Sequence, residues 1–298
     1  YNSANIKWNI MNRLSNTREY HSRNQTGTSA NAVSIPVYVT GNFINHKLLF
    51  MKTKLPMPGI RVIVWMLFAL LLGGNTFGQI TQRGTATTAT STATTITINK
   101  PSGVLPGDIL LVNITQTDND GNNLSNASAS GWTVIDGRLI YDAGSDSWWG
   151  TVLYRVVTGS EGNNFTFTLD GDATEGNTAA MVAFYNVNTT AGVTETGAAG
   201  GPFDVDPGTI VVPGTASNNI SITGISNATA GAGIVMFVNL ANDNSLTNNS
   251  WNTSSPGALA ELADNPFNST TDPGVGIGFA VKSTVGSTGN GTVTQSAS

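Results

Sequence analysis

The chain has 298 residues and contains no cysteine, which excludes disulfides, thiolate metal sites, iron–sulfur clusters and cysteine nucleophiles. Both histidines, His21 and His46, lie in the first fifty residues. A serine triad needs a base that titrates near neutrality, so in residues 79–298 only Lys100 or Lys282 can take that role. No phosphate-binding loop or dinucleotide fingerprint follows a strand–helix junction.

Charged residues are also scarce, at 10% of the chain, but a hydrophobic share of 39% argues against a disordered protein. Thr, Ser, Asn and Gly supply the polarity, which favours strands separated by many turns. Residues 79–298 contain five basic residues against seventeen acids. Because such a surface repels a phosphate backbone, we expect no nucleic-acid partner.

An export signal is predicted inside the chain. Residues 51–78 begin with basic residues and continue with an unbroken apolar run, Val62–Leu72. A helix of that length spans about half of the ~30 Å hydrocarbon core, so a buried helix or a short anchor is the alternative. The order of basic, apolar and small residues is typical of a signal peptide cleaved after Gly78. We expect a product that begins at Gln79, has no transmembrane segment and is secreted or held at the cell surface.

Residues 1–50 are interpreted as an upstream extension outside the native protein. The sequence begins with Tyr1, the signal predicts a start at Met51, and the intervening residues show no sustained hydrophobic period. We expect this segment to be unstructured. A genuine N-terminal extension that begins at Met11 is the alternative.

From Gln79 onward the sequence predicts strands and no helix. Phe165, Phe167 and Leu169 alternate with threonines, a period of two that indicates one buried face and antiparallel pairing. Similar apolar runs recur between Gly, Asn, Asp and Pro clusters. The predicted strands are 94–99, 108–116, 132–140, 149–158, 165–169, 180–187, 210–212, 220–225, 233–240, 275–281 and 291–298.

With no crossover helices, these strands predict an all-β sandwich or barrel over residues 94–298. Residues 79–93 are rich in Thr and Ala and are interpreted as a linker. The runs at 180–187 and 233–240 are apolar on both faces and are expected to be central strands. The core between two sheets is expected to contain Leu110, Val112, Leu153, Phe165, Phe167, Phe184, Met236, Phe279 and Val281.

An ordered set of motifs supports this fold. P-x-G-V-x-x-G-D-I-L-L (101–111) precedes G-W-T-V-I (131–135), V-L-Y-R-V-V-T-G-S-E (152–161), F-T-F-T-L (165–169) and A-A-M-V-A-F-Y-N-V (179–187). This order resembles a module of bacterial surface proteins and phage structural proteins, whose pattern runs GDLLLA, AGWT, YYKVATASE and AYSGVD. The resemblance implies a two-sheet antiparallel β-sandwich that is jelly-roll-like. It also implies one more strand after Ser298, so we expect the domain to be truncated at its C-terminus.

Four aromatic side chains are candidates for ligand binding: Tyr141, Trp148, Trp149 and Trp251. Neighbouring residues of a strand point to opposite faces, so one of Trp148 and Trp149 should be buried and the other exposed. An exposed indole beside Tyr141 can stack on a sugar ring or on a partner protein. Packing against a neighbouring loop is the alternative for each of them.

Three acidic loops are candidate binding sites for Ca²⁺. No other cofactor is expected. The oxygen ligands would come from Asp118 and Asp120, Asp170 and Asp172, and Asp204 and Asp206. None of these loops matches an EF-hand. Turns stabilised by aspartate and asparagine side chains are the alternative for all three.

These observations predict a secreted, non-catalytic β-sandwich module of a larger surface protein, with an adhesion or display role and a glycan or surface protein as partner. A carbohydrate-binding module that stacks aromatic rings on sugars is the second hypothesis. A glycan-active enzyme is the third, since two carboxylates suffice for that chemistry. Its candidate glutamates are Glu175, Glu195 and Glu261, because Glu161 is interpreted as part of a turn in T-G-S-E-G-N.

Overall fold

The computed structural model describes residues 4–11, 78–118, 124–142, 146–170, 176–212, 217–242, 244–267 and 273–296. They belong to one unit, made of Tyr1–Ser15 and Phe77–Ser298, and their regular structure is entirely β. The predicted all-β fold with antiparallel pairing is therefore confirmed for these residues. Within the same ranges, no helix has the length and apolar character needed to cross a membrane. The predicted signal segment at 51–78 lies outside them except for its last residue, Gly78.

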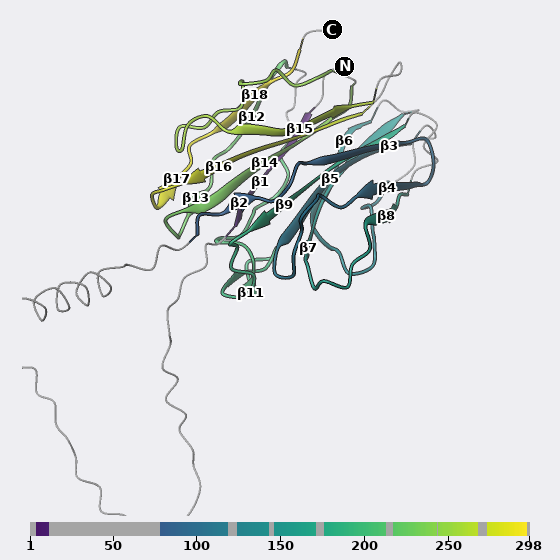
Figure 1. Ribbon diagram of the computed structural model, residues 1–298. Helices are drawn as coiled ribbons and strands as arrows, with labels where there is room; N and C mark the ends of the chain where they lie inside the picture. Colours follow the sequence, from purple (N-terminus) through teal and green to yellow (C-terminus); the bar gives the residue numbers. More distant parts are fainter. Residues whose placement is uncertain are drawn as a thin grey trace, which may run out of the picture. The chain divides into compact units, whose positions relative to one another are not determined.

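The larger sheet has the strand order β2–β9–β5–β7–β6, and β3 also pairs with β9 (Figure 1). Residues 79–93 are not a linker, because they supply β2 and β3. Their Thr-rich sequence suits an exposed edge, and β3 pairs with β9 along its whole length. The six strands are β2 (Thr81–Gln82), β3 (Thr87–Ser91), β5 (Ile109–Asp118), β6 (Thr133–Asp142), β7 (Ser147–Val156) and β9 (Asn177–Tyr185).

The smaller sheet has the order β1–β14–β16–β15, with β14 (Ala232–Leu240), β16 (Gly274–Lys282) and β15 (Ala260–Pro266). Its first strand, β1 (Ala4–Met11), comes from the segment that we expected to be unstructured. That expectation does not hold for these eight residues. The sequence from Asn5 to Ile10 alternates polar and apolar residues, a short period of two that suits pairing with β14.

Two ribbons flank the sheets. β4 (Thr95–Asn99) pairs with β8 (Asn164–Thr168), and β12 (Asn219–Ile222) pairs with β18 (Gly291–Thr294). The predicted strand at 210–212 does not form, whereas β15 was not predicted, because its sequence mixes acids, alanine and proline. The remaining short pairs are β10 (Gly192–Val193) with β11 (Ala199–Gly201), and β13 (Ser226–Asn227) with β17 (Gly286–Ser287).

The apolar interior forms three main clusters rather than the single core that we expected. The first fills the space between the two sheets and includes Phe184 of β9 and Phe237 of β14. The second lies between the smaller sheet and the β12–β18 ribbon, and includes Met236. The third lies between the larger sheet and the β4–β8 ribbon, and includes Phe167. Three layers arise because β5, β9 and β14 are buried on both faces. Seven of the nine predicted core residues are buried, but of these only Phe184 lies between the two sheets as expected; the other six lie against a ribbon. Phe279 and Val281 are half-buried.

Polar side chains cross between the two sheets at one end. Asn239 of β14 is buried and its amide donates to Asn113 Oδ1 at 2.8 Å, to the Ile114 carbonyl at 3.1 Å and to Thr115 Oγ1 at 2.9 Å. The Asn113 amide donates in return to the Val238 carbonyl at 2.8 Å. Because a buried amide without a partner lowers the stability of the fold, this network fixes the alignment of β5 against β14.

Candidate functional site

The adjacent tryptophans lie on opposite faces of β7, as predicted. Trp148 is 4% exposed and packs on Tyr141 with ring centroids 5.6 Å apart. Trp149 is half-buried, and its Nε1 donates to Asn126 Oδ1 at 2.8 Å. The hypothesis that Trp148 stacks on a ligand is wrong for this conformation, because its ring is covered. Tyr141 and Trp149 do not share a face on which both can stack on one sugar.

Trp251 was expected in a loop, where either ligand binding or packing was open to it, and its side chain is 0% exposed. Its indole lies over Gly276 and Gly278 of β16, where an added Cβ would meet the ring or the neighbouring Leu246 side chain. Its Nε1 donates to Glu261 Oε2 at 2.8 Å. The alternating glycines of β16 leave a slot for the ring, a signal that we did not use. Trp251 is therefore a core residue.

The described acidic side chains mostly stabilise turns. Asp204 Oδ2 accepts hydrogen bonds from the backbone N–H groups of Ala228 at 2.5 Å and Thr229 at 3.0 Å, and Asp206 Oδ1 accepts one from Gly208 at 2.8 Å. These contacts fit the turn alternative. The other four candidates stand as follows: Asp118 is buried at the end of β5, Asp170 is exposed, and Asp120 and Asp172 lie outside the described residues.

The acidic loops do not converge on a metal-binding cluster in the described ranges, where no group of three metal-ligating side chains is found. Asp204 Oδ1 is buried without a hydrogen-bond partner there. One such oxygen does not make a calcium site, because Ca²⁺ takes six to eight oxygen ligands. Asp204 and Asp206 form the one predicted pair that lies wholly within the described residues, and no further acidic side chain joins them in a group of three.

Residues of the shared motifs meet where β7 ends. Glu161 accepts hydrogen bonds from the backbone N–H groups of Thr158 and Gly159, each at 2.7 Å, and pairs with Arg155 at 3.2 Å. Burial raises the pKa of Glu161, but the hydrogen bonds from Thr158 and Gly159 outweigh it and lower the pKa to about 2. Arg155 also donates to the Ser130 carbonyl at 3.0 Å. Glu161 therefore serves the turn, as the turn interpretation predicted.

Trp132 completes this corner. Its ring packs edge-on against Phe165 and Phe167, with centroids 5.1 Å from each. The motifs G-W-T-V-I and F-T-F-T-L therefore help to hold the β4–β8 ribbon onto the larger sheet. Arg155 and Glu161, the charged residues of the motif at 152–161, are engaged beside them.

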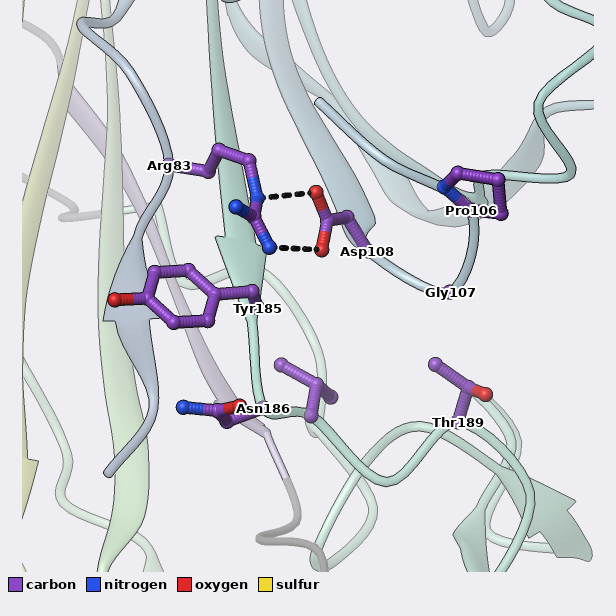
Figure 2. Close-up of a pocket in the computed structure, with 8 residues that line it drawn as sticks. Arg83, Pro106, Gly107, Asp108, Tyr185, Asn186 and Thr189 are labelled. Atoms are coloured by element: carbon purple, nitrogen blue, oxygen red, sulfur yellow. Dashed lines mark hydrogen bonds and ion pairs between the residues drawn. The ribbon is translucent and has the colours of Figure 1, made fainter. Parts of the chain in front are cut away.

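A polar pocket of about 320 Å³ opens where β9 ends and β5 begins (Figure 2). Arg83, from the segment between β2 and β3, lies opposite Asp108 in it. Its guanidinium makes a two-pronged ion pair with that carboxylate, with Nε–Oδ2 at 2.6 Å and Nη2–Oδ1 at 3.1 Å. The same guanidinium lies 4.3 Å from the centre of the Tyr185 ring. Sequence reasoning gave no role to any of these three residues, although Asp108 belongs to the quoted G-D motif.

Asp108 and Asn186, two polar residues of this pocket, make further contacts within the protein. Asp108 Oδ2 also accepts a hydrogen bond from the Leu105 backbone N–H at 2.8 Å, and the Asn186 amide donates to the Gln79 carbonyl at 3.0 Å. Because the charges of Arg83 and Asp108 already neutralise each other, they attract an ionic ligand only weakly. The ion pair with Arg83 instead fastens the segment after the predicted cleavage point to the larger sheet.

Two carboxylates lie on β15, which is the arrangement that the enzyme hypothesis needs. A β-bulge between Glu261 and Ala263 places Glu261 opposite Gly278 and Asp264 opposite Gly276. Alternate positions of one strand share a face, so both acids lie on the face that Trp251 covers. Sequence reasoning named Glu261 but not its neighbour, because without the bulge residues three apart fall on opposite faces.

Both acids are engaged with the loop that carries Trp251. Glu261 accepts the indole N–H, and Asp264 Oδ2 accepts the Leu246 backbone N–H at 2.9 Å. Burial raises the pKa of Asp264 to about 6; the hydrogen bond from Leu246 opposes this rise, and the charge of Glu261 adds to it. The pair therefore anchors a loop over the smaller sheet.

The two lysines that can replace histidine as a base are also engaged. The buried Lys282 ammonium donates to Ser255 Oγ at 3.1 Å and to Thr284 Oγ1 at 3.0 Å. Lys100 Nζ donates to the Glu161 carbonyl at 3.4 Å.

No protein-family model matches the chain, and no curated protein or solved structure is significantly similar to it. The resemblance to surface and phage modules therefore stays a prediction that rests on the quoted motifs.

Proposed function

We propose that the protein is an exported, non-catalytic display module of a larger cell-surface protein, built as a two-sheet, jelly-roll-like β-sandwich. The observation that carries this proposal is the engagement of its reactive side chains. Glu161, Glu261 and Asp264 each accept a hydrogen bond that holds a turn or a loop, and Lys282 donates to two hydroxyls. Side chains committed in this way support a rigid scaffold rather than proton transfer.

Export is supported by the order of residues 51–78 and by the acidic, weakly charged sequence that follows. The test is the mass of the product that a bacterial host secretes from the full gene. We expect a chain that begins at Gln79. Leu67→Arg should abolish secretion, because a charge interrupts the apolar run, whereas the matched control Leu67→Met should be secreted normally. A product that retains Val62–Leu72 would contradict the proposal.

The non-catalytic claim is tested on the same product with a glycan array, with and without a chelator, beside a hydrolysis screen on the same polysaccharides. We expect no turnover. Hydrolysis that Glu261→Gln abolishes would establish an enzyme instead. Chelator-sensitive glycan binding lost in Trp149→Ala but kept in the matched control Trp132→Phe would establish a carbohydrate-binding module.

A further inference from the structure

The strand β14 is paired on both sides. β16 pairs with it from Ala232 to Leu240, and β1 pairs with it in the register Ala4↔Leu240 to Met11↔Gly233. Neither ladder contains a register shift. β1 is therefore the end strand of the smaller sheet, and β15 is the strand at its other end.

Without β1, β14 would be an edge strand with none of the usual protection. β6 and β15, which are edges, contain register shifts and charged residues, and β15 also ends in Pro266. β14 reads AGIVMFVNL, with no charge, no proline and no bulge. A long, apolar and regular edge is a template for pairing with another chain. Its sequence thus requires a neighbour on each side.

The strand that covers this edge, β1, lies upstream of the predicted signal segment. Under the proposed export, cleavage after Gly78 removes Ala4–Met11 from the product. The exported domain would then contain β14 and lack the strand that covers it.

We propose that the outer edge of β14 is a strand-binding site, which in the exported protein takes an extended segment of another protein. The segment runs antiparallel to β14, spans about eight residues and alternates apolar with polar residues. This chemistry follows from β1, in which Ile6, Trp8 and Ile10 stand opposite Val238, Met236 and Ile234. Backbone hydrogen bonds supply the affinity of such added strands, and alternate side chains supply the specificity. The partner requirement rests on the proposed export, whereas the binding edge does not.

The test uses the full chain, kept inside the cell by Leu67→Arg, with a site for a sequence-specific protease in place of Gly73–Thr76. The purified protein is cut in the presence of excess fluorescent peptide of residues 2–13. We expect the peptide to replace the cut N-terminal piece on the remaining domain. Hydrogen exchange of the β14 amides should then be ~tenfold or more slower with the peptide than after its removal, while exchange of β9 is unchanged.

Two peptides provide the matched controls. A peptide with Ile6, Trp8 and Ile10 each changed to Asn should not bind, because it lacks the apolar alternation. A peptide with Asn5→Ser and Asn9→Ser keeps the alternation and should bind like the native sequence.

Three results would overturn the proposal. The first is a cut protein that releases its N-terminal piece, binds neither peptide and keeps β14 protected. The second is a dimer that protects β14 without peptide, since a second copy would then occupy the edge. The third is unfolding on cutting even with peptide present. A secreted product that retains residues 1–78 would remove the need for a partner, even if the peptide replaces the cut N-terminal piece. The mass of the secreted product therefore tests the proposed export, and peptide binding tests the strand-binding site on β14.

Discussion

β9 and β14 are alike in sequence and burial but differ in where their neighbours come from. Each is a nine-residue strand with both faces apolar, and each contributes one face to the cluster between the sheets. β9 is flanked by β5 on one side and by β2 and β3 on the other, all of them after Gly78. β14 is flanked by β16 and by β1, which lies before the predicted signal segment.

This difference shows that a strand's composition predicts how many neighbours it needs, not which segments provide them. Apolar residues on both faces indicate a central position, because both faces must be covered. The hydrogen-bonding edge is independent of those faces. Under the proposed export, cleavage after Gly78 would therefore break the chain between β1 and β14, two strands that pair in one sheet.

The largest expected effect concerns the apolar face that β9 and β14 share. Phe184→Ala and Phe237→Ala should each lower the free energy of unfolding by roughly 3–5 kcal/mol, because both rings are fully buried between the sheets. Urea denaturation of the full chain measures both. Similar losses are expected, since the two rings lie in one cluster. A loss below ~1 kcal/mol for Phe237→Ala alone would mean that the sheets do not pack through β14.

The next effect concerns the polar residue that each strand sends across to the other sheet. Asn239→Ala on β14 should cost about 1–3 kcal/mol, because it leaves Asn113 and Thr115 with unsatisfied buried groups. On β9, Thr178 exchanges hydrogen bonds of 2.7 and 2.9 Å with Asn265, and Thr178→Val is the matched comparison. It should cost less, because Asn265 keeps its bond to the Ala89 carbonyl.

A double-mutant cycle between Asn113 and Asn239 checks the origin of that cost. We expect the two single losses to be strongly non-additive, since the side chains bond directly at 2.8 Å. Additive losses would mean that the network does not join the two sheets.

Smaller effects should distinguish the sheets by their response to acid. Glu161 lies in the turn after β7, and its pKa is lowered from 4.5 to about 2 in the folded state. The unfolded chain therefore takes up this proton first, and the stability that Glu161 provides is present above about pH 4.5 and is lost as the pH falls toward 2. Glu161→Gln should flatten this part of a stability–pH curve. An unchanged slope would contradict the assignment.

The smaller sheet should respond in the opposite direction through Asp264 of β15. Its pKa rises from 3.8 to about 6 on folding, so the folded state holds the proton more tightly between these values. Stability should then decrease as the pH rises from 3.8 to 6. Asp264→Asn keeps an oxygen for the Leu246 N–H and should be more stable than the wild type at pH 7. Urea midpoints at pH 4 and pH 7 measure the difference.

Much of the fold follows from local sequence patterns. Thr166 and Thr168 alternate with buried Phe165 and Phe167, and such a period of two identifies both a strand and its covered face. The apolar runs of β9 and β14 were rightly expected to be central. β1 was missed because its short period lies in a polar segment upstream of the predicted signal, and β15 because its acids are covered by a distant loop.

The candidate site was predicted less well, because a side chain's environment is set by residues far away in sequence. Trp251 lies among Asn and Ser residues, yet two glycines of β16 provide the space that buries it. The split between Trp148 and Trp149 was predictable, since it depends only on strand geometry. The ion pair of Arg83 with Asp108 was not, because 25 residues and a strand pairing separate the two.

The hydrogen bond between Asn186 and Gln79 bears on the order of cleavage and folding. In the folded domain the Asn186 amide binds the carbonyl of Gln79, a side chain at position 78 would collide with that amide, and Ile80 is buried two residues beyond Gly78. A peptidase needs the bond between Gly78 and Gln79 drawn out into its own cleft, which this arrangement resists. Under the proposed export, cleavage thus precedes folding. Each copy would then reach the cell exterior before β1 could pair with β14. The smaller sheet would be completed only after an extended segment of another protein binds to β14.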